Sequence, residues 1–498
     1  PGLQRCRRGD RRRAMVRRQS RGPVTDEIRL WNTLGRGLEV FAPLGDRIRI
    51  YTCGPTVYGR AHIGNLRTFL WEDVLCRALE HLGHRVEQVM NLTDVEDKII
   101  NGAAKAGVSI REFTAPHVDD FFKDLDRLHV RRAALYPRAT EHVPEMIELV
   151  ARLIETGHAY ISEGSVFFRI ESDADYGRLS GVDLSAARRG ERVADDEYGK
   201  DDVRDFVLWK AAKPGEPSWD SPWGPGRPGW HIECSAMSMK YFGPSFDIHC
   251  GGVDNIFPHH ENEIAQSESA TGAPFARYWL HAEHLIVDSQ KMSKSLGNQH
   301  TLDDVLAQGA DPRAVRYALL SVHYRQKQNF TFAAVEQAAA ALRRIDDFRF
   351  RLGHTAETAA ASDAMTAAAS RLATDFSAAL RDDLNVSAAL AAVFGFVREA
   401  NVAIEESRLG PGDREVAARA LREVDAVLGV LHQEEWAPAG EAATAAGLAD
   451  GEIESLVAER EAARRARDFR RSDALRDQLR NGGVLVEDTA SGPRWRRE

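Results

Sequence analysis

The sequence predicts an α/β protein that opens with a doubly wound fold and continues into a bundle of helices. In residues 47–53 polar and apolar side chains alternate, as in a strand, and residues 66–82 repeat apolar side chains every fourth position, as in a helix. A second strand pattern over residues 86–92 completes the strand–loop–helix–strand unit with which a doubly wound sheet begins. The Ala-rich residues 332–431 have helical periodicity and almost no strand pattern, which predicts the bundle.

The composition is typical of a globular enzyme of several domains. Among 498 residues, 43 % are hydrophobic and 28 % are charged, and the formal net charge is −9. No run approaches eighteen apolar residues, so the sequence predicts no membrane-spanning segment. The five cysteines are odd in number and widely scattered, which excludes a disulfide scaffold and predicts a reducing, cytoplasmic compartment. The net acidity, taken alone, argues against a nucleic-acid partner.

The first part of the chain is strongly basic. Residues 1–22 carry nine arginines against one acid, Asp10, and residues 1–25 are expected to form a disordered, dispensable extension. They lack the apolar stretch of a secretory signal. Three interpretations stay open: a transit-like peptide, a basic arm for RNA, and residues that precede a true start at Met15.

The rest of the chain divides into three predicted parts. Residues 26–322 are expected to form the α/β domain, with an insertion over about 141–225 that contains a helix, short strands and a Pro/Gly-rich loop. Residues 323–437 form the predicted helix bundle. In residues 438–498 an Ala/Gly linker leads to a small α/β unit, with one charged helix over 452–480, a Gly-Gly turn and one strand.

The segment His62-Ile63-Gly64-Asn65 stands directly before the helix predicted over residues 66–82. The start of a helix offers free amide groups and a positive dipole, so phosphates bind there. Gly64 lets a nucleotide approach the backbone closely, and His62 can donate a hydrogen bond to a phosphate oxygen. Taken alone, these four residues are equally compatible with an ordinary surface loop.

A second segment with phosphate-binding chemistry spans residues 291–298. Lys291 and Lys294 lie three positions apart on a short Ser/Gly loop, which suits a triphosphate whose charge grows in the transition state. A solvated loop is the alternative for this segment alone. Together with the histidine segment, it resembles the paired signature of class I aminoacyl-tRNA synthetases, which implies a Rossmann-type catalytic domain.

Four scattered residues have the chemistry of a zinc site: Cys53, Cys234, His259 and Glu263. Two thiolates, an imidazole and a carboxylate make a plausible tetrahedral set. His259 and Glu263 are four positions apart, and they would share one face of a helix that Pro258 can open. Considered singly, each of them is also compatible with a buried cysteine or a hydrogen-bonded core residue.

The chain resembles the cysteinyl-tRNA synthetases from about residue 27 to residue 497, most clearly in residues 53–58, 91–94 and 246–267 and in the block around Trp230. The resemblance implies ATP-dependent activation of L-cysteine and transfer to tRNA(Cys), with one Zn²⁺ per chain and Mg²⁺ with ATP. It implies that the zinc is held by Cys53, Cys234, His259 and Glu263. It further implies catalysis by His62, Asn65, Lys291 and Lys294, ATP binding by the same residues with Gly64, and an amino-acid and adenosine pocket lined by Thr93, Trp230, His249 and Asp254.

In that family the zinc selects the substrate. A soft thiolate binds Zn²⁺ far better than the hydroxyl of serine does. A metal–sulfur bond can therefore replace an editing site, and the short insertion leaves no room for a separate editing domain. Asn65 stands where the histidine signature has His, a variation that the family tolerates.

The resemblance implies that the bundle contacts the stem and anticodon of tRNA and that residues 438–498 bind tRNA as well. Residues 460–480 of the predicted last helix carry eight arginines against four acids, with Phe469 among them to stack an unpaired base, and Arg464 and Asp473 as further tRNA contacts. Two alternatives stay open. One is a cysteine:amino-sugar ligase of mycothiol synthesis, which ends soon after the bundle; the other is a non-catalytic RNA-binding paralogue. The family expectation is a monomer.

Overall fold

The computed structural model describes residues 26–182, 204–293, 296–357, 363–436, 450–482, 484–489 and 492–497. The basic extension, Lys294 and most of the predicted linker therefore lie outside the described residues. The chain divides into two compact units, residues 1–431 and 432–498, and each is described by itself.

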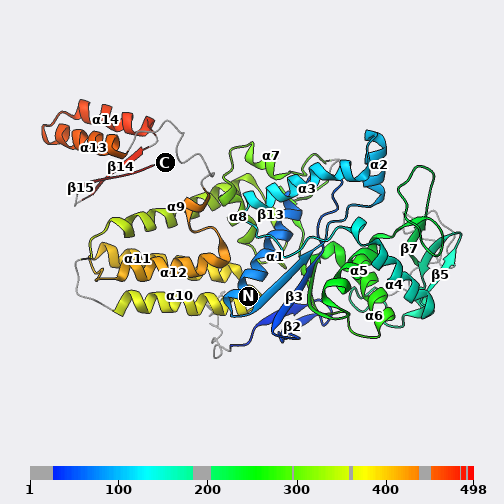
Figure 1. Ribbon diagram of the computed structural model, residues 1–498. Coiled ribbons are helices and arrows are strands. Elements are labelled where there is room, and N and C mark those ends of the chain that lie inside the picture. The colour runs from blue at the N-terminus through cyan, green and yellow to red at the C-terminus, as the bar shows by residue number, and fades with distance from the viewer. Residues whose placement is uncertain are drawn as a thin grey trace, which may run out of the picture. The chain divides into compact units, whose positions relative to one another are not determined.

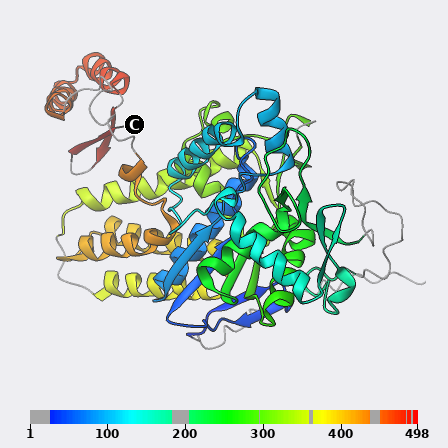
Figure 2. The same cartoon turned by 45° about the vertical axis from the view of Figure 1, so that its right-hand side comes forward.

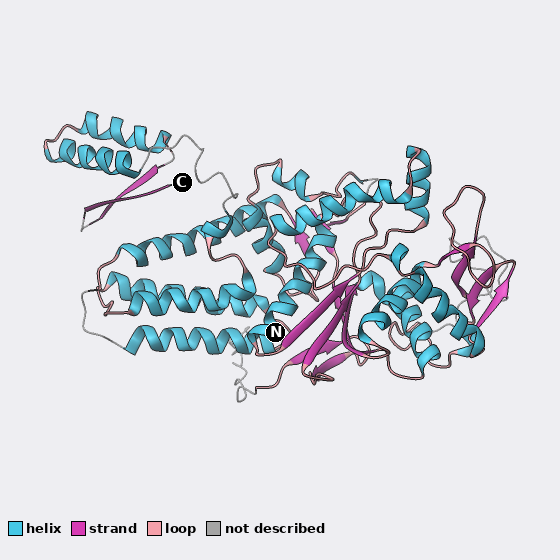
Figure 3. Ribbon diagram, viewed as in Figure 1, coloured by secondary structure: helices cyan, strands magenta, loops and turns pink. Residues whose placement is uncertain are grey.

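The core of the first unit is a four-stranded parallel sheet with the order β10-β9-β3-β4 (Figures 1 and 3). Its strands are β3 (Arg47–Thr52), β4 (Arg85–Met90), β9 (Phe246–Gly252) and β10 (Ala276–Ala282), and all three pairings are parallel. The direction of winding reverses between β3 and β9. In doubly wound sheets, ligands bind at the carboxyl ends of the strands at this switch point. The predicted α/β class is confirmed.

Helix α1 (Ile63–His81) connects β3 to β4, and its capping groups explain why it starts earlier than predicted. The His62 side chain accepts a hydrogen bond from Asn65 N, and the Asn65 side chain accepts one from His62 N. This capping box satisfies two amides that a helix start leaves unpaired. The apolar periodicity begins only at Leu66, so it places the helix start three residues late.

The segment between β4 and β9 holds a second, antiparallel sheet. Helix α4 (Val143–Glu155) leads into β5 (Ala159–Ser162), β6 (Ser165–Phe168), β7 (Phe206–Ala211) and β8 (Gly226–Pro228), which pair in chain order. The strands of this sheet share the apolar core of the first unit with α4 and with the metal-site helices described below. The chain then returns to the parallel sheet and places the next site residues at its carboxyl edge.

Four helices follow the sheet domain and lie side by side in both views (Figures 1 and 2). They are α9 (Phe332–His354), α10 (Asp363–Arg381), α11 (Val386–Glu405) and α12 (Asp413–Leu428). The predicted bundle is confirmed. Among the described residues, α11 alone has the length and apolar composition of a membrane-crossing helix, but it packs against α9 and α10 in the bundle.

The second unit differs from its prediction in two respects. The single helix predicted over 452–480 is wrong: the structure has α13 (Asp450–Arg465) and α14 (Phe469–Asn481). Arg467 adopts a left-handed φ of 61°, and the Asp468 side chain caps α14 by accepting from Arg471 N at 3.0 Å. Charge patterning does not reveal such a break. The C-terminal tail is also a strand, β15 (Gly492–Arg497), paired antiparallel with β14 (Val484–Thr489).

Candidate functional site: a metal centre beside the nucleotide motifs

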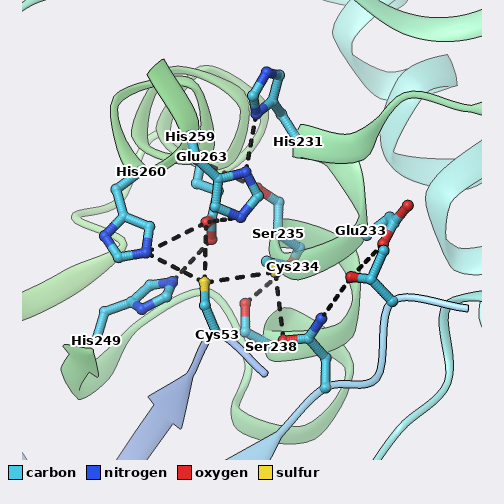
Figure 4. A network of polar contacts seen from close by, with 12 residues as sticks. Cys53, His231, Glu233, Cys234, Ser235, Ser238, His249, His259, His260 and Glu263 are labelled. Carbon is cyan, nitrogen blue, oxygen red and sulfur yellow. Dashed lines mark hydrogen bonds and ion pairs between the residues drawn. The ribbon is translucent and has the colours of Figure 1, made fainter. Parts of the chain in front are cut away.

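The four predicted zinc ligands converge at the carboxyl edge of the parallel sheet (Figure 4). Cys53 directly follows β3, and Cys234 lies in α5 (Trp230–Phe242). The two sulfur atoms are 3.9 Å apart, and Cys53 Sγ is 3.9 Å from Glu263 Oε1. Glu263 Oε1 is 3.1 Å from His259 Nε2. One donor atom from each residue lies within 4.8 Å of the others, although 181 residues separate the two cysteines.

The predicted helical pairing of His259 and Glu263 is confirmed, with one refinement. Phe257 has extended backbone angles (φ −137°, ψ 131°), and a helical turn begins after it and runs into α6 (Glu261–Thr271). His259 thus lies one turn before Glu263 on the same face. Pro258 suits the start of this turn because proline needs no amide partner there.

The structure adds imidazoles that the sequence reasoning missed or placed differently. His249, predicted as a pocket residue, lies with its Nε2 2.9 Å from Glu263 Oε2. His260 Nε2 is 3.2 Å from Cys53 Sγ, and its other ring nitrogen is 2.8 Å from His281. With Cys53 and Glu263, His249 and His260 form a second group of converging donors. In the sequence, only the adjacency of His259 and His260 indicated that further imidazoles lie at this centre.

Burial controls the protonation of these groups. It raises the pKa of the Cys53 thiol to about 11 and raises the pKa of the Glu263 carboxyl. Burial and neighbouring imidazoles lower the pKa of His259 and His260, and burial lowers the pKa of His281 to about 3. His259, His260 and His281 are therefore neutral near pH 7, which leaves ring nitrogens available as ligands.

This donor set fits a metal cation. Glu263 is fully buried, and its side-chain contacts among the described residues are imidazoles and Cys53, with no arginine or lysine. A buried carboxylate without a cationic partner is costly. A bound cation removes that cost and stabilises both thiolates, since metal binding displaces thiol protons.

The two predicted nucleotide segments meet at the start of α1, whose N-cap His62 lies nine residues after Cys53 in the chain. Ile63 N donates to His300 O at 2.9 Å, and His62 forms an isolated bridge with Thr301. A Cβ atom on Gly64 would lie 2.4 Å from Met292 Cε, so the Met292 side chain of the lysine segment packs directly over Gly64. Lys291 ends the short strand β12 (Gln290–Lys291) and is exposed.

Family models match almost the whole chain in consecutive pieces. Residues 40–340 match the class I (C) tRNA synthetase catalytic domain, residues 375–432 the DALR domain and residues 447–496 the cysteinyl-tRNA ligase anticodon binding domain. The chain is 45 % identical over 493 residues to the cysteine–tRNA ligase of Koribacter versatilis (strain Ellin345), a match that covers 95 % of this chain and all of that protein. It is 47 % identical over 469 residues to that of Chlamydia pneumoniae, covering 93 % and 97 %.

The chain belongs to the cysteine–tRNA ligase family. Cysteine–tRNA ligases are aminoacyl-tRNA synthetases, enzymes that act on an amino acid, ATP and tRNA. The match to the anticodon binding domain supports this family over the amino-sugar ligase and the non-catalytic paralogue. In fold, the chain resembles Mycobacterium tuberculosis methionyl-tRNA synthetase in complex with methionyl-adenylate, with a TM-score of 0.58, 16 % identity, and coverage of 82 % of this chain and 95 % of that one.

In this cysteine–tRNA ligase, three of the predicted pocket residues contact the metal-site cluster or its neighbours. Trp230, 40 % exposed, stacks on His259 with ring centroids 4.1 Å apart. Thr93 donates to Glu233 and accepts from Asn91, both at 3.1 Å. His249 contacts Glu263, as described above. The fourth, Asp254, lies exposed on the short helix Val253–Asn255 that follows β9.

The predicted tRNA contacts of the ligase lie in its second unit. Phe469 is 65 % exposed at the first position of α14. Arg464 pairs with Asp488 at 2.5 Å, and Asp473 pairs with Arg476 at 3.3 Å. Of these three residues, Phe469 alone has a largely exposed aromatic ring that a ligand can stack on, whereas Arg464 and Asp473 are ion-paired.

Proposed function

We propose that the chain activates L-cysteine with ATP and transfers the cysteinyl group to the terminal adenosine of tRNA(Cys), selecting cysteine through zinc. The observation that carries this proposal is the convergence of Cys53, Cys234, His259 and Glu263 at the end of β3, the strand that leads into the histidine segment. Two thiols, a neutral imidazole and a carboxylate form a donor set suited to Zn²⁺. When bound, Zn²⁺ supplies a soft Lewis acid that binds the thiolate of cysteine in preference to a hydroxyl.

Four side chains of the protein are proposed to bind and orient the amino acid beside the metal. Thr93 holds the substrate through its hydroxyl, which Glu233 and Asn91 orient. Trp230 covers the substrate from its position over His259. His249 steadies the Glu263 carboxylate, and Asp254 accepts from polar groups of the substrate or adenosine at the rim.

In the activation step, the cysteine carboxylate attacks the α-phosphorus of ATP. A carboxylate–phosphorus bond forms and the bond to pyrophosphate breaks, so the chain mainly positions the reactants and neutralises charge. Because His62 Nδ1 accepts from Asn65 N, the neutral ring carries its proton on Nε2 and can donate it to a phosphate oxygen. Gly64 admits the nucleotide, Asn65 maintains the cap, and Lys291 and Lys294 stabilise the triphosphate, with Mg²⁺ on its oxygens.

In the transfer step, the 2′-hydroxyl of the terminal adenosine attacks the cysteinyl carbonyl carbon and AMP leaves. The bundle and the second unit are proposed to bind the tRNA, with a base stacked on Phe469 and with Arg464 and Asp473 at its edge. The enzyme is proposed to act as a cytoplasmic monomer.

The test uses the full chain purified with its metal. Cysteine-dependent ATP–pyrophosphate exchange, about one zinc per chain and charging of tRNA(Cys) are expected together. Serine is expected to give negligible exchange. Exchange without tRNA charging, but with transfer to an amino-sugar, would instead identify the amino-sugar ligase; absence of exchange with zinc present would refute the proposal.

A further inference from the structure

Asp383 links the helix bundle to the catalytic domain. It lies in the turn between α10 and α11 and is only 3 % exposed. Its Oδ1 accepts from Trp31 N at 2.8 Å and from the Tyr324 hydroxyl at 2.7 Å. Its Oδ2 accepts from Arg325 Nε at 2.6 Å. One carboxylate of the bundle therefore binds both the N-terminal strand β1 (Arg29–Asn32) and the segment 323–325.

The backbone of this turn is strained. Asp383 and Leu384 have consecutive left-handed φ values of 55° and 53°. Aspartate tolerates this region, but it is costly for a residue such as leucine, and Leu384 is buried. Strain of this kind persists where the surrounding structure fixes it, and it clusters at functional positions.

From residues 323–325, one path leads to the strand that ends in Lys291. Glu283 N donates to Tyr324 O at 2.8 Å, just before β11 (Leu285–Val287). Strand β11 pairs with β13 (Gln328–Phe330) on one side and with β12 on the other. The position of the 323–325 segment thus determines the position of the strand pair that carries Lys291.

A second path leads to helix α1. The buried Arg67 guanidinium donates to Glu283 O, to His323 O at 3.2 Å and to Gln326 O at 2.9 Å. The Tyr324 ring stacks on Trp71, with centroids 4.5 Å apart. Both Arg67 and Trp71 belong to α1, whose N-cap is His62. The 323–325 segment therefore contacts both elements that carry the proposed ATP-binding residues.

We propose that Asp383 is a positioning residue for amino-acid activation. By holding residues 323–325, it keeps the β11–β12 pair in register with the start of α1, so that Lys291 and His62 face the same triphosphate. This inference rests on the proposed roles of those two residues. Asp383, a residue of the helix bundle, thereby has a role in amino-acid activation, a step that requires no tRNA.

The test compares Asp383→Asn with Asp382→Asn in the full chain. Both remove one carboxylate from the same turn, but Asp382 is exposed and makes none of the hydrogen bonds described above. Pyrophosphate exchange is measured without tRNA, with ATP and cysteine varied separately and rates normalised to active sites. Asp383→Asn is expected to lower kcat/KM for ATP by about 10- to 100-fold, since small misplacements are costly to catalysis. Its zinc content and its KM for cysteine are expected to equal those of Asp382→Asn and the wild type.

A second variant protects the test against misfolding. Tyr324→Phe removes one hydrogen bond to Asp383 and retains the aromatic ring over Trp71. Tyr324→Phe is expected to lower kcat/KM for ATP by a smaller factor than Asp383→Asn does. If Asp383→Asn does not fold, Tyr324→Phe alone tests the positioning role. A merely structural role would lower the melting temperature and leave the kinetics of the folded enzyme unchanged.

Two outcomes overturn the inference: normal exchange in the folded variants, and a defect confined to tRNA charging. Failure of the proposed function looks different, because the wild type itself would then show no cysteine-dependent exchange.

Discussion

Two thiols, a carboxyl group and several imidazoles share the candidate metal centre. Each of these side chains is buried, and the carboxyl group contacts no arginine or lysine among the described residues. Such a cluster is unfavourable unless a cation occupies it. At the scale of the residue, the centre therefore depends on each of its ligands.

Cys234→Ser is expected to abolish zinc retention and the discrimination between cysteine and serine together. A serine hydroxyl is a poor zinc ligand at neutral pH, because it does not deprotonate as a thiol does. Zinc content by atomic absorption and exchange with both amino acids measure the effect. Cys76→Ser is the matched control, since Cys76 is equally buried on α1 but lies outside both donor groups. Full zinc with normal cysteine activation in Cys234→Ser would contradict the assignment.

Glu72 is a second buried carboxyl group, and it predicts a pH dependence of stability. It lies on α1, fully buried, and neither carboxyl oxygen has a hydrogen-bond partner in the part of the chain that the structure describes. Burial raises its pKa well above the ordinary value, so the folded chain still holds a proton at pH values where the unfolded chain has already released it. This group therefore costs no stability below the unfolded pKa of about 4.3, and it costs progressively more as the pH rises toward the folded value.

Glu72→Gln removes the ionisable group and is expected to remove this contribution to the pH dependence. The melting temperature of the variant relative to wild type is expected to rise from pH 5 to pH 8. Thermal unfolding in matched buffers gives the difference directly. A pH-independent difference would mean that Glu72 ionises equally in both states.

At the scale of the element, the start of α1 combines capping with nucleotide access. His62 and Asn65 satisfy each other's backbone amides, which explains how asparagine serves at the fourth position of the motif. Gly64 lies between this cap and Met292 of the lysine segment. The same backbone turn thus determines where α1 begins and how closely the lysine segment packs against the histidine segment.

Gly64→Ala is expected to slow adenylate formation by about 10- to 100-fold. The added Cβ would lie 2.4 Å from Met292 Cε and 3.0 Å from the His62 ring. The flexible tip of Met292 can move aside, so the expected loss comes from crowding of the His62 ring and from the methyl group on the backbone that the nucleotide approaches. Pyrophosphate exchange measures the rate, and zinc content serves as the check on the neighbouring centre. Gly83→Ala, at the other end of α1 with no atom within 4 Å, is a control for the substitution itself, although its φ of 93° adds local strain. An unchanged exchange rate in Gly64→Ala would show that the contact is not needed.

At the scale of the whole molecule, the net charge of −9 averages over unlike parts. The C-terminal unit gathers eight arginines in and between its helices, of which Arg460 is buried and paired with Asp488 at 2.7 and 2.9 Å. These arginines face only four acids within residues 460–480, and residues 1–22 are also basic. The remainder of the chain is acidic, so non-specific RNA binding is expected to be weak, with a modest dependence on salt. Recognition of tRNA must then rest on local contacts.

Truncation after residue 437 is expected to raise the KM for tRNA on the order of tenfold or more and to leave pyrophosphate exchange intact. One stacked base is worth about 1–3 kcal/mol, and 1.4 kcal/mol corresponds to a factor of ten. Aminoacylation kinetics of the truncated and full chains, at several salt concentrations, measure the effect. The point variant Phe469→Ala offers a milder form of the same test. Equal loss of exchange and charging would contradict the division of roles.

The sequence by itself determined the α/β class, the helix bundle, the two nucleotide segments and the pairing of His259 with Glu263. These features depend on local periodicity and on short spacings such as that of His259 and Glu263, which backbone geometry converts directly into shared faces. The family resemblance supplied the partners that spacing cannot, such as Cys53 and Cys234.

Only the tertiary structure decided which distant side chains meet. The order β10-β9-β3-β4 brings His249, His260 and His281 around Cys53, and no periodicity encodes that order. The break between α13 and α14 came from one capping aspartate within a continuous run of charges. Asp383 lies 58 residues from Arg325 and 352 from Trp31, so its role emerges only when the bundle folds against the sheet. Contacts of that kind are set by packing, which a linear pattern does not record.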